Sequence, residues 1–284
     1  MTTEVGPIEL LTEPLSFGTT WRAIVEMTIL GVAGGVIGCW VVLYRLSFGA
    51  ESLAHGMLPG LVLAGLIGLP LLLGGAVGIL VAGLLVAAAT RIRRSDPDTA
   101  VAVVVTTLFG VGILMALSPA SPPAVGELLF GNLLGTTDTE ILISAAATVL
   151  TVAVVWTLHP RLLAIGFDGD AGGFVRMPTT LVTFILLALV SVAILVSVQA
   201  LGTLLVAALL VGPAASARLL TRRVAPMILT SASIAILAGL AGVYSSFYLR
   251  TSAGASVVVF ILMFFFAAAA LKLVRSRIPA IERV

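Results

Sequence analysis

Glu51 and His55 stand four residues apart in the apolar segment AESLAHGMLPG. In a helix, residues at i and i+4 share one face, so the carboxylate and the imidazole would point at a common spot. Oxygen and nitrogen donors in that arrangement suit a divalent transition metal. An ionisable side chain inside a membrane segment is costly and therefore indicates function, but a buried ion pair that orients two spans is the structural alternative. The two residues alone leave both interpretations open.

The composition restricts the class of protein. The chain has 284 residues, is 60% hydrophobic and only 10% charged, and its mean hydropathy is +1.22. A chain this apolar is a multi-pass membrane protein. Its single cysteine, Cys39, excludes an internal disulfide and a zinc–cysteine site. The only lysine, Lys272, follows Leu271, so the GxxxxGK[ST] nucleotide-binding loop is absent. We expect a transport subunit that is not an enzyme by itself and whose ATP, if it uses any, is bound by another chain.

The hydropathy pattern predicts an all-α bundle of about nine transmembrane helices, because a span needs about 20 apolar residues. The whole chain, 1–284, forms one transmembrane domain in this interpretation. Residues 1–22 carry acidic but almost no basic side chains, which predicts an uncleaved polar lead rather than a signal peptide. The nine spans lie near 24–44, 50–68, 71–90, 98–117, 139–158, 179–197, 200–219, 227–245 and 254–273.

The basic residues predict the orientation of these spans. With nine spans, thirteen of the fifteen arginines and lysines fall on one side, and only Arg22 and Arg250 fall on the other. Basic residues gather on the cytoplasmic side of membrane proteins. The rule therefore predicts an external N-terminus, a cytoplasmic tail over 274–284, and the Glu51–His55 pair in the cytoplasmic half of the cell membrane.

Four segments, in this order, resemble the metal-permease family of ATP-binding-cassette importers, which take up zinc, manganese or iron. They are VVLYRLSFGAESLAHGMLPGLVLA, ELLFGNLLG, HPRLLAIGFDGDAGGFVRMP and VSVQALGTLLVAALLVGPAASARLL. Many relatives carry Asp-Ala-Leu-Ser-His where this chain has Glu51-Ser52-Leu53-Ala54-His55, so the carboxylate is kept but is one methylene longer. The resemblance implies that Glu51 and His55 bind the transported ion transiently and that no cofactor is held permanently. Zinc, manganese and iron all stay open.

The same resemblance implies partners. Two permease chains, expected to form a homodimer, would line the path, two cytoplasmic ATPases would bind beneath, and an external metal-binding protein would deliver the ion. The loop over 159–178 would couple the permease to the ATPase, through Gly166, Phe167, Asp168, Asp170 and Phe174. The alternative is a self-sufficient secondary transporter or channel, which usually needs several intramembrane carboxylates.

Other residues could line the path or pack the helices. Pro59 and Pro213 fall within spans, where proline kinks or interrupts a helix. Gln199 lines the path or makes a helix–helix hydrogen bond, and the sequence favours neither. Glu26 is expected to pair with Arg22 at i, i+4. The glycines of GVAGGVIG predict a close helix–helix approach.

Overall fold

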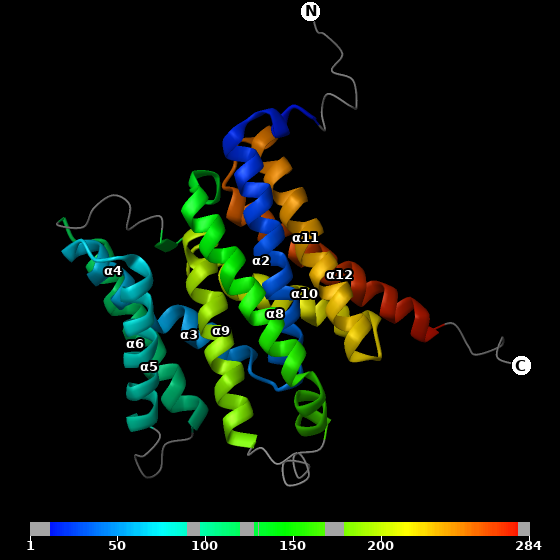
Figure 1. Ribbon diagram of the computed structural model, residues 1–284, viewed down its shortest axis with the longest axis horizontal. Helices are drawn as coiled ribbons and strands as arrows, with labels where there is room; N and C mark the ends of the chain where they lie inside the picture. The colour runs from blue at the N-terminus through cyan, green and yellow to red at the C-terminus, as the bar shows by residue number, and fades with distance from the viewer. Residues whose placement is uncertain (1–11, 90–96, 120–127, 130, 168–178, 278–284) are drawn as a thin grey trace, which may run out of the picture.

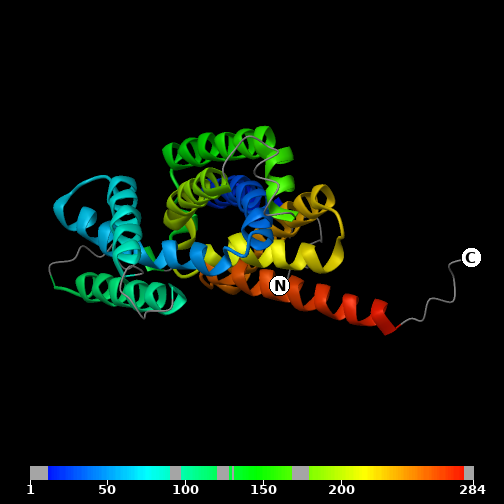
Figure 2. The ribbon, with the colours of Figure 1, turned by 90° about the horizontal axis from the view of Figure 1, so that it is seen from below.

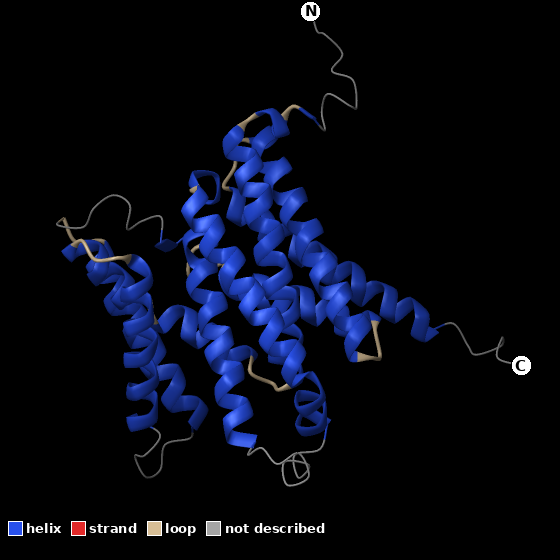
Figure 3. Ribbon diagram, in the orientation of Figure 1, coloured by secondary structure: helices blue, strands red, loops and turns tan. Residues whose placement is uncertain are grey.

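The described parts of the chain are helical. The computed structural model describes residues 12–89, 97–119, 128–129, 131–167 and 179–277, and these ranges contain no strand. Two short 3-10 turns, η1 (Pro14–Ser16) and η2 (Leu133–Gly135), accompany the helices (Figures 1 and 3). The helices are α2 (Gly18–Leu43), α3 (Ser47–Gly56), α4 (Leu58–Ile67), α5 (Leu71–Ala89), α6 (Pro97–Ala116), α8 (Asp138–Phe167), α9 (Thr179–Leu201), α10 (Val206–Leu220), α11 (Val224–Leu249) and α12 (Ala253–Arg277).

The helices form two groups joined by α3. Helix α2 packs against α8, α9, α10 and α11, and α12 packs against α10 and α11. Helices α4, α5 and α6 pack on one another to form the second group. Helix α3 runs between the groups, and it contacts α5 and α6 on one side and α9 and α10 on the other (Figures 1 and 2). The short helix that carries Glu51 and His55 thus lies at the junction of the two groups.

The all-α prediction is confirmed, with a finer division of the spans. Within the described residues, eight helical segments are long and apolar enough to cross a membrane. The seventh predicted span, 200–219, corresponds to α10, whose 15 residues would measure about 22 Å against a hydrocarbon core of about 30 Å. The second predicted span is divided at Met57 into α3 and α4, and Pro59 stands in the first turn of α4. Proline is tolerated there because the first N–H groups of a helix have no partner within it.

Large apolar side chains cover the outside of the bundle. Leu84 of α5, Leu114 of α6 and Trp156 of α8 are 71%, 73% and 81% exposed. A soluble protein rarely shows so much contiguous apolar surface, whereas lipid tails accept it without cost. These helix faces are therefore the surfaces that meet the bilayer.

The glycines of α2 let neighbouring helices approach its backbone, as GVAGGVIG predicts. A Cβ atom added at Gly35 would collide with the backbone of Ala232 in α11, and one added at Gly38 would collide with the carbonyl of Leu210 in α10. In lipid the hydrophobic effect does not drive helices together, so close van der Waals packing of their backbones stabilises the association instead. These contacts make α2 the central helix of the larger group.

Candidate functional site

Glu51 and His55 face the same side of α3. His55 Nε2 lies 3.9 Å from Glu51 Oε1. This separation is too long for a hydrogen bond, so neither atom uses its lone pairs on the other. Two ligands of one metal ion, each about 2.1 Å from it, stand about 3.0–3.4 Å apart. A small rotation of the flexible Glu51 side chain would close that difference.

The imidazole of His55 is held by the second group of helices. Its ring packs on Phe109 of α6, with centroids 4.8 Å apart. The next residue, Gly56, faces Ala82 of α5 so closely that a Cβ atom there would lie 2.8 Å from the Ala82 methyl group. These contacts fix the ring, while His55 Nδ1 is buried with no hydrogen-bond partner among the described residues.

Glu51 is more exposed than a carboxylate in a membrane span should be. Its side chain is 55% exposed and that of His55 is 21% exposed. Phe48 lies one turn before Glu51 on the same face and is 48% exposed. Carboxylates within membrane spans face protein or a water-filled cavity, because contact with lipid tails is costly. This face of α3 therefore needs a cover that the described residues of the chain do not supply.

The pair offers two donors, which is fewer than a tightly bound metal ion takes. Among the described residues no three His, Cys, Asp or Glu side chains gather into a metal site. Structural zinc sites use four protein ligands, whereas a site that must release its ion leaves positions for water or for another chain. The geometry suits transient coordination.

A second polar region lies where two distant segments dock through their backbones. The backbone N–H of Asn132 donates to the backbone carbonyl of Gln199 at 3.1 Å, and that of Thr203 donates to the backbone carbonyl of Leu128 at 2.9 Å. Gly131 and Gly202 lie in this contact with φ of +75° and +78°, and a Cβ atom on either would strike the opposite backbone. The contact joins two of the four segments that carry the family resemblance, ELLFGNLLG and VSVQALGTLL.

Gln199, one of the proposed path residues, lies at this contact and lines a polar cavity that begins beside it. Pro213 is buried inside α10. No contact of either residue within the described ranges assigns it to the path, so both remain predictions.

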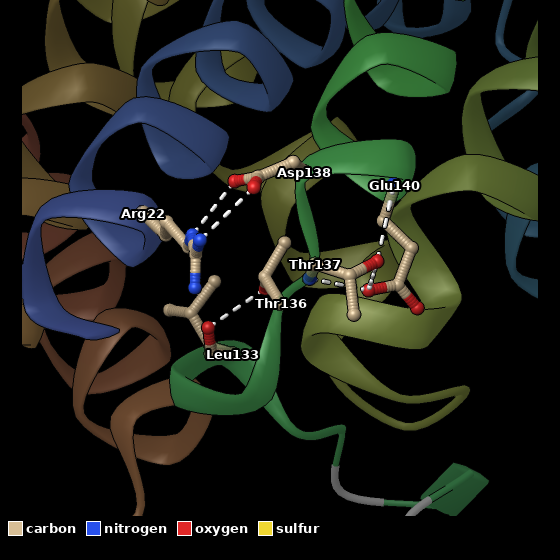
Figure 4. Close-up of polar contacts among 6 residues, drawn as sticks. All are labelled: Arg22, Leu133, Thr136, Thr137, Asp138 and Glu140. Atoms are coloured by element: carbon tan, nitrogen blue, oxygen red, sulfur yellow. Dashed lines mark hydrogen bonds and ion pairs between the residues drawn. The ribbon is translucent and has the colours of Figure 1, made fainter. Parts of the chain in front are cut away.

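The expected Arg22–Glu26 pair is wrong. The Arg22 guanidinium instead donates to both carboxylate oxygens of Asp138, at 2.7 and 2.9 Å (Figure 4). Glu26 is only 1% exposed and accepts a hydrogen bond from Ser144 Oγ at 2.6 Å. Arg22 lies at the surface of α2, where a bidentate partner is in reach and Glu26 is buried behind it.

Two of the proposed ATPase-coupling residues, Gly166 and Phe167, fall at the end of α8. Helix α8 continues through His159 and Pro160 to Phe167, so the segment 159–178 begins as two more turns of that helix. Gly166 lies against the ring of Tyr44, whose hydroxyl donates to the Leu162 carbonyl at 3.0 Å. Phe167 is the last residue of α8, whereas Asp168, Asp170 and Phe174 lie outside the described residues.

The membrane-spanning helices and the exposed Glu51–His55 pair indicate the class of protein, which is a multi-pass helical membrane transport protein. The particular family follows from a match of residues 16–272 to the model of the ABC 3 transport family. The chain belongs to that family.

Curated relatives and a solved structure agree with this assignment. The chain is 27% identical to the manganese transport system membrane protein MntC of Halalkalibacterium halodurans, over 86% of this chain and 84% of that protein. It is 28% identical to the chelated iron transport system membrane protein YfeD of Yersinia pestis, over 88% and 84%. PsaBC from Streptococcus pneumoniae, solved with a Fab, matches with a TM-score of 0.85 and 25% identity over 92% of this chain and 94% of that chain.

An inward-facing structure of a putative metal-chelate type ABC transporter also matches, with a TM-score of 0.69. Its identity is 13%, so this likeness concerns the fold.

Proposed function

We propose that this chain is the transmembrane permease of an ATP-driven importer for a divalent transition metal, and that Glu51 and His55 coordinate the ion during its passage. The observation that carries the proposal is the open pair on α3, with 3.9 Å between His55 Nε2 and Glu51 Oε1 in an otherwise apolar span. The family and the names of the relatives, which handle manganese or iron, support the cargo class.

A second copy of the chain is the cover that the exposed face of α3 needs. Most oligomers of identical chains are two-fold symmetric, so a residue near the axis lies close to its own copy in the partner. A dimer with Phe48, Glu51 and His55 along its axis would enclose a polar path and could supply a second Glu51–His55 pair to the same ion. The side-chain exposure of Glu51, 55%, supports this arrangement.

The end of the bundle that carries most basic residues would be cytoplasmic and would bind the ATPases. The last turns of α2, α5, α8 and α10 lie toward one end of the bundle (Figure 1). Arg218 at the end of α10 donates to the carbonyl of Val42 at the end of α2, which places these two ends side by side. The positive-inside rule assigns this end to the cytoplasm, and the opposite end would receive the metal-binding protein.

The proposal is tested with the permease reconstituted in proteoliposomes with its ATPase and binding protein. Metal uptake should require ATP and should be lost in Glu51→Gln and in His55→Ala, while Glu13→Gln, which neutralises an exposed carboxylate far from α3, should retain it. Uptake that needs no ATP would favour the self-sufficient transporter instead. Normal uptake in both site variants would show that the pair is structural.

A further inference from the structure

A polar cavity of about 170 Å³ lies at the end of the bundle where α8 begins, apart from the Glu51–His55 pair. Residues of α2, α8 and α9, of the segment around η2 and of the start of α5 surround it. Its lining includes two carboxylates, Glu26 and Glu140, and no basic side chain among the residues that form it. The remaining lining residues are Leu71, Leu128, Asn132, Gly135, Thr136, Thr137, Val196, Gln199 and Ala200.

Among the residues that line the cavity, Glu26 has a carboxylate oxygen without a hydrogen-bond partner in the described part of the chain. It is 1% exposed, and its Oε1 atom accepts from Ser144 Oγ at 2.6 Å. Its Oε2 atom is buried and has no hydrogen-bond partner in the part of the chain that the structure describes. A buried carboxylate oxygen without a partner is costly, and buried charges in proteins are paired or coordinate metals. Because Glu26 lines the cavity, an ion held there would supply the partner that its Oε2 atom lacks.

Glu140 also lines the cavity and offers a second carboxylate. Its Oε2 atom caps the start of α8, accepting from the amide and the hydroxyl of Thr137 at 2.7 and 2.8 Å. The other oxygen points away from Thr137 (Figure 4). The neighbouring carboxylate, Asp138, differs because both of its oxygens bind Arg22 and it does not line the cavity.

We infer that this cavity is a second cation site, in which Glu26 and Glu140 bind a divalent ion through oxygen atoms alone. The amide of Gln199 and water complete the coordination. A volume of 170 Å³ holds about five water molecules, so the ion keeps part of its hydration shell, as hard cations held by one or two carboxylates usually do. The inference rests on the proposed function for its cargo: on the external side of the membrane, the site receives the metal before it reaches Glu51 and His55.

The test measures Mn²⁺ binding to the purified full-length chain in lipid nanodiscs, by the loss of the paramagnetic resonance signal of free Mn²⁺. The Glu51→Gln/His55→Ala double variant removes the inner pair and should still bind one Mn²⁺ ion. Adding Glu26→Gln to it should raise the Kd at least about tenfold, since a neutral amide replaces the buried charge. Glu140→Gln should act in the same direction, and it serves as the second variant if Glu26→Gln fails to fold.

Two controls separate charge from structure. Glu26→Gln keeps an oxygen that accepts from Ser144, and Ser144→Ala removes that hydrogen bond while keeping the carboxylate, so Ser144→Ala should retain Mn²⁺ binding. Asp138→Asn neutralises a carboxylate two residues from Glu140 and should leave the Kd unchanged.

Absence of Mn²⁺ binding in the Glu51→Gln/His55→Ala variant would overturn the inference, and so would equal binding with and without Glu26→Gln. Either result leaves ATP-dependent uptake, and hence the proposed function, intact. Conversely, ATP-independent uptake would reject the proposed function without changing the Mn²⁺ titration.

Discussion

At the scale of single residues, Glu51 and His55 form a contact of 3.9 Å, which is too long for a hydrogen bond but within the range of an ion pair. The separation therefore fits both a ligand pair and a structural pair, and metal affinity distinguishes the two. The Glu51→Asp variant restores the shorter carboxylate of many relatives and should still bind metal. Glu51→Gln keeps the size and the polarity but loses the charge, so we expect metal binding at least about tenfold weaker. Calorimetric titration of the two variants measures this difference, and equal affinities would contradict metal ligation by Glu51.

Residue types and spacing within one helix are enough to predict this pair, because i, i+4 neighbours meet wherever the helix is packed. They are not enough for Arg22, whose partner is 116 residues away. Spacing finds Glu26 beside Arg22, but burial of Glu26 against Ser144 and the bidentate geometry of Asp138 depend on how α2 and α8 pack. Partners this far apart in the chain cannot be predicted from residue spacing in a single sequence.

At the scale of helices, the glycines of α2 set how closely α10 and α11 approach. We expect Gly35→Ala to destabilise the protein by about 1–3 kcal/mol, because the new methyl group meets the backbone of Ala232, which has no freedom to turn away. Gly83→Ala in α5 is the matched control, since a Cβ atom there meets nothing within 4 Å and alanine favours a helix. Thermal unfolding in detergent compares the two, and a Gly35→Ala protein as stable as Gly83→Ala would show that α2 tolerates wider packing.

The docking of residues 128–129 and 131–132 on 199–204 involves two glycines in the left-handed conformation, Gly131 and Gly202. Gly202→Ala should cost more stability than Gly68→Ala, since both residues have φ near +75° but only the first also collides, with Leu129 and Gly131. Gly68 ends α4 in open space, so its substitution measures the backbone strain alone. The difference between the two melting temperatures therefore reports the docking contact, and no difference would mean that the two segments separate readily.

The two segments illustrate the limits of prediction at this scale. Their similarity to known permeases is visible in the sequence, but their contact with each other is not. The residues around each glycine do not indicate that Gly131 and Gly202 lie where the two backbones cross. The sequence also does not reveal that α8 continues past Pro160. A proline inside a helical pattern usually kinks or ends the helix, but the apolar residues that follow, LLAIGF, continue α8 to Phe167.

At the scale of the whole molecule, the two helix groups meet along α3, and the chain exposes the face that carries Glu51 and His55. Composition predicts the membrane bundle, since a mean hydropathy of +1.22 is far above the range of soluble domains. It cannot predict which face is covered by a partner, because lipid-facing and partner-facing helices are both apolar. The discriminating feature is Glu51, a charge on a surface that lipid would not accept.

The proposed two-fold axis can be examined by cross-linking. In a cysteine-free background made by Cys39→Ala, the Phe48→Cys variant places a thiol one turn from Glu51 on the face that we assign to the partner. A short bismaleimide added to membranes should convert this variant into covalent dimers, because residues near a two-fold axis lie close to their own copies. Trp156→Cys is the control, as that side chain is 81% exposed on the face of α8 assigned to lipid. Dimers formed through position 156 and not through position 48 would place the interface on α8 and leave Glu51 without its cover.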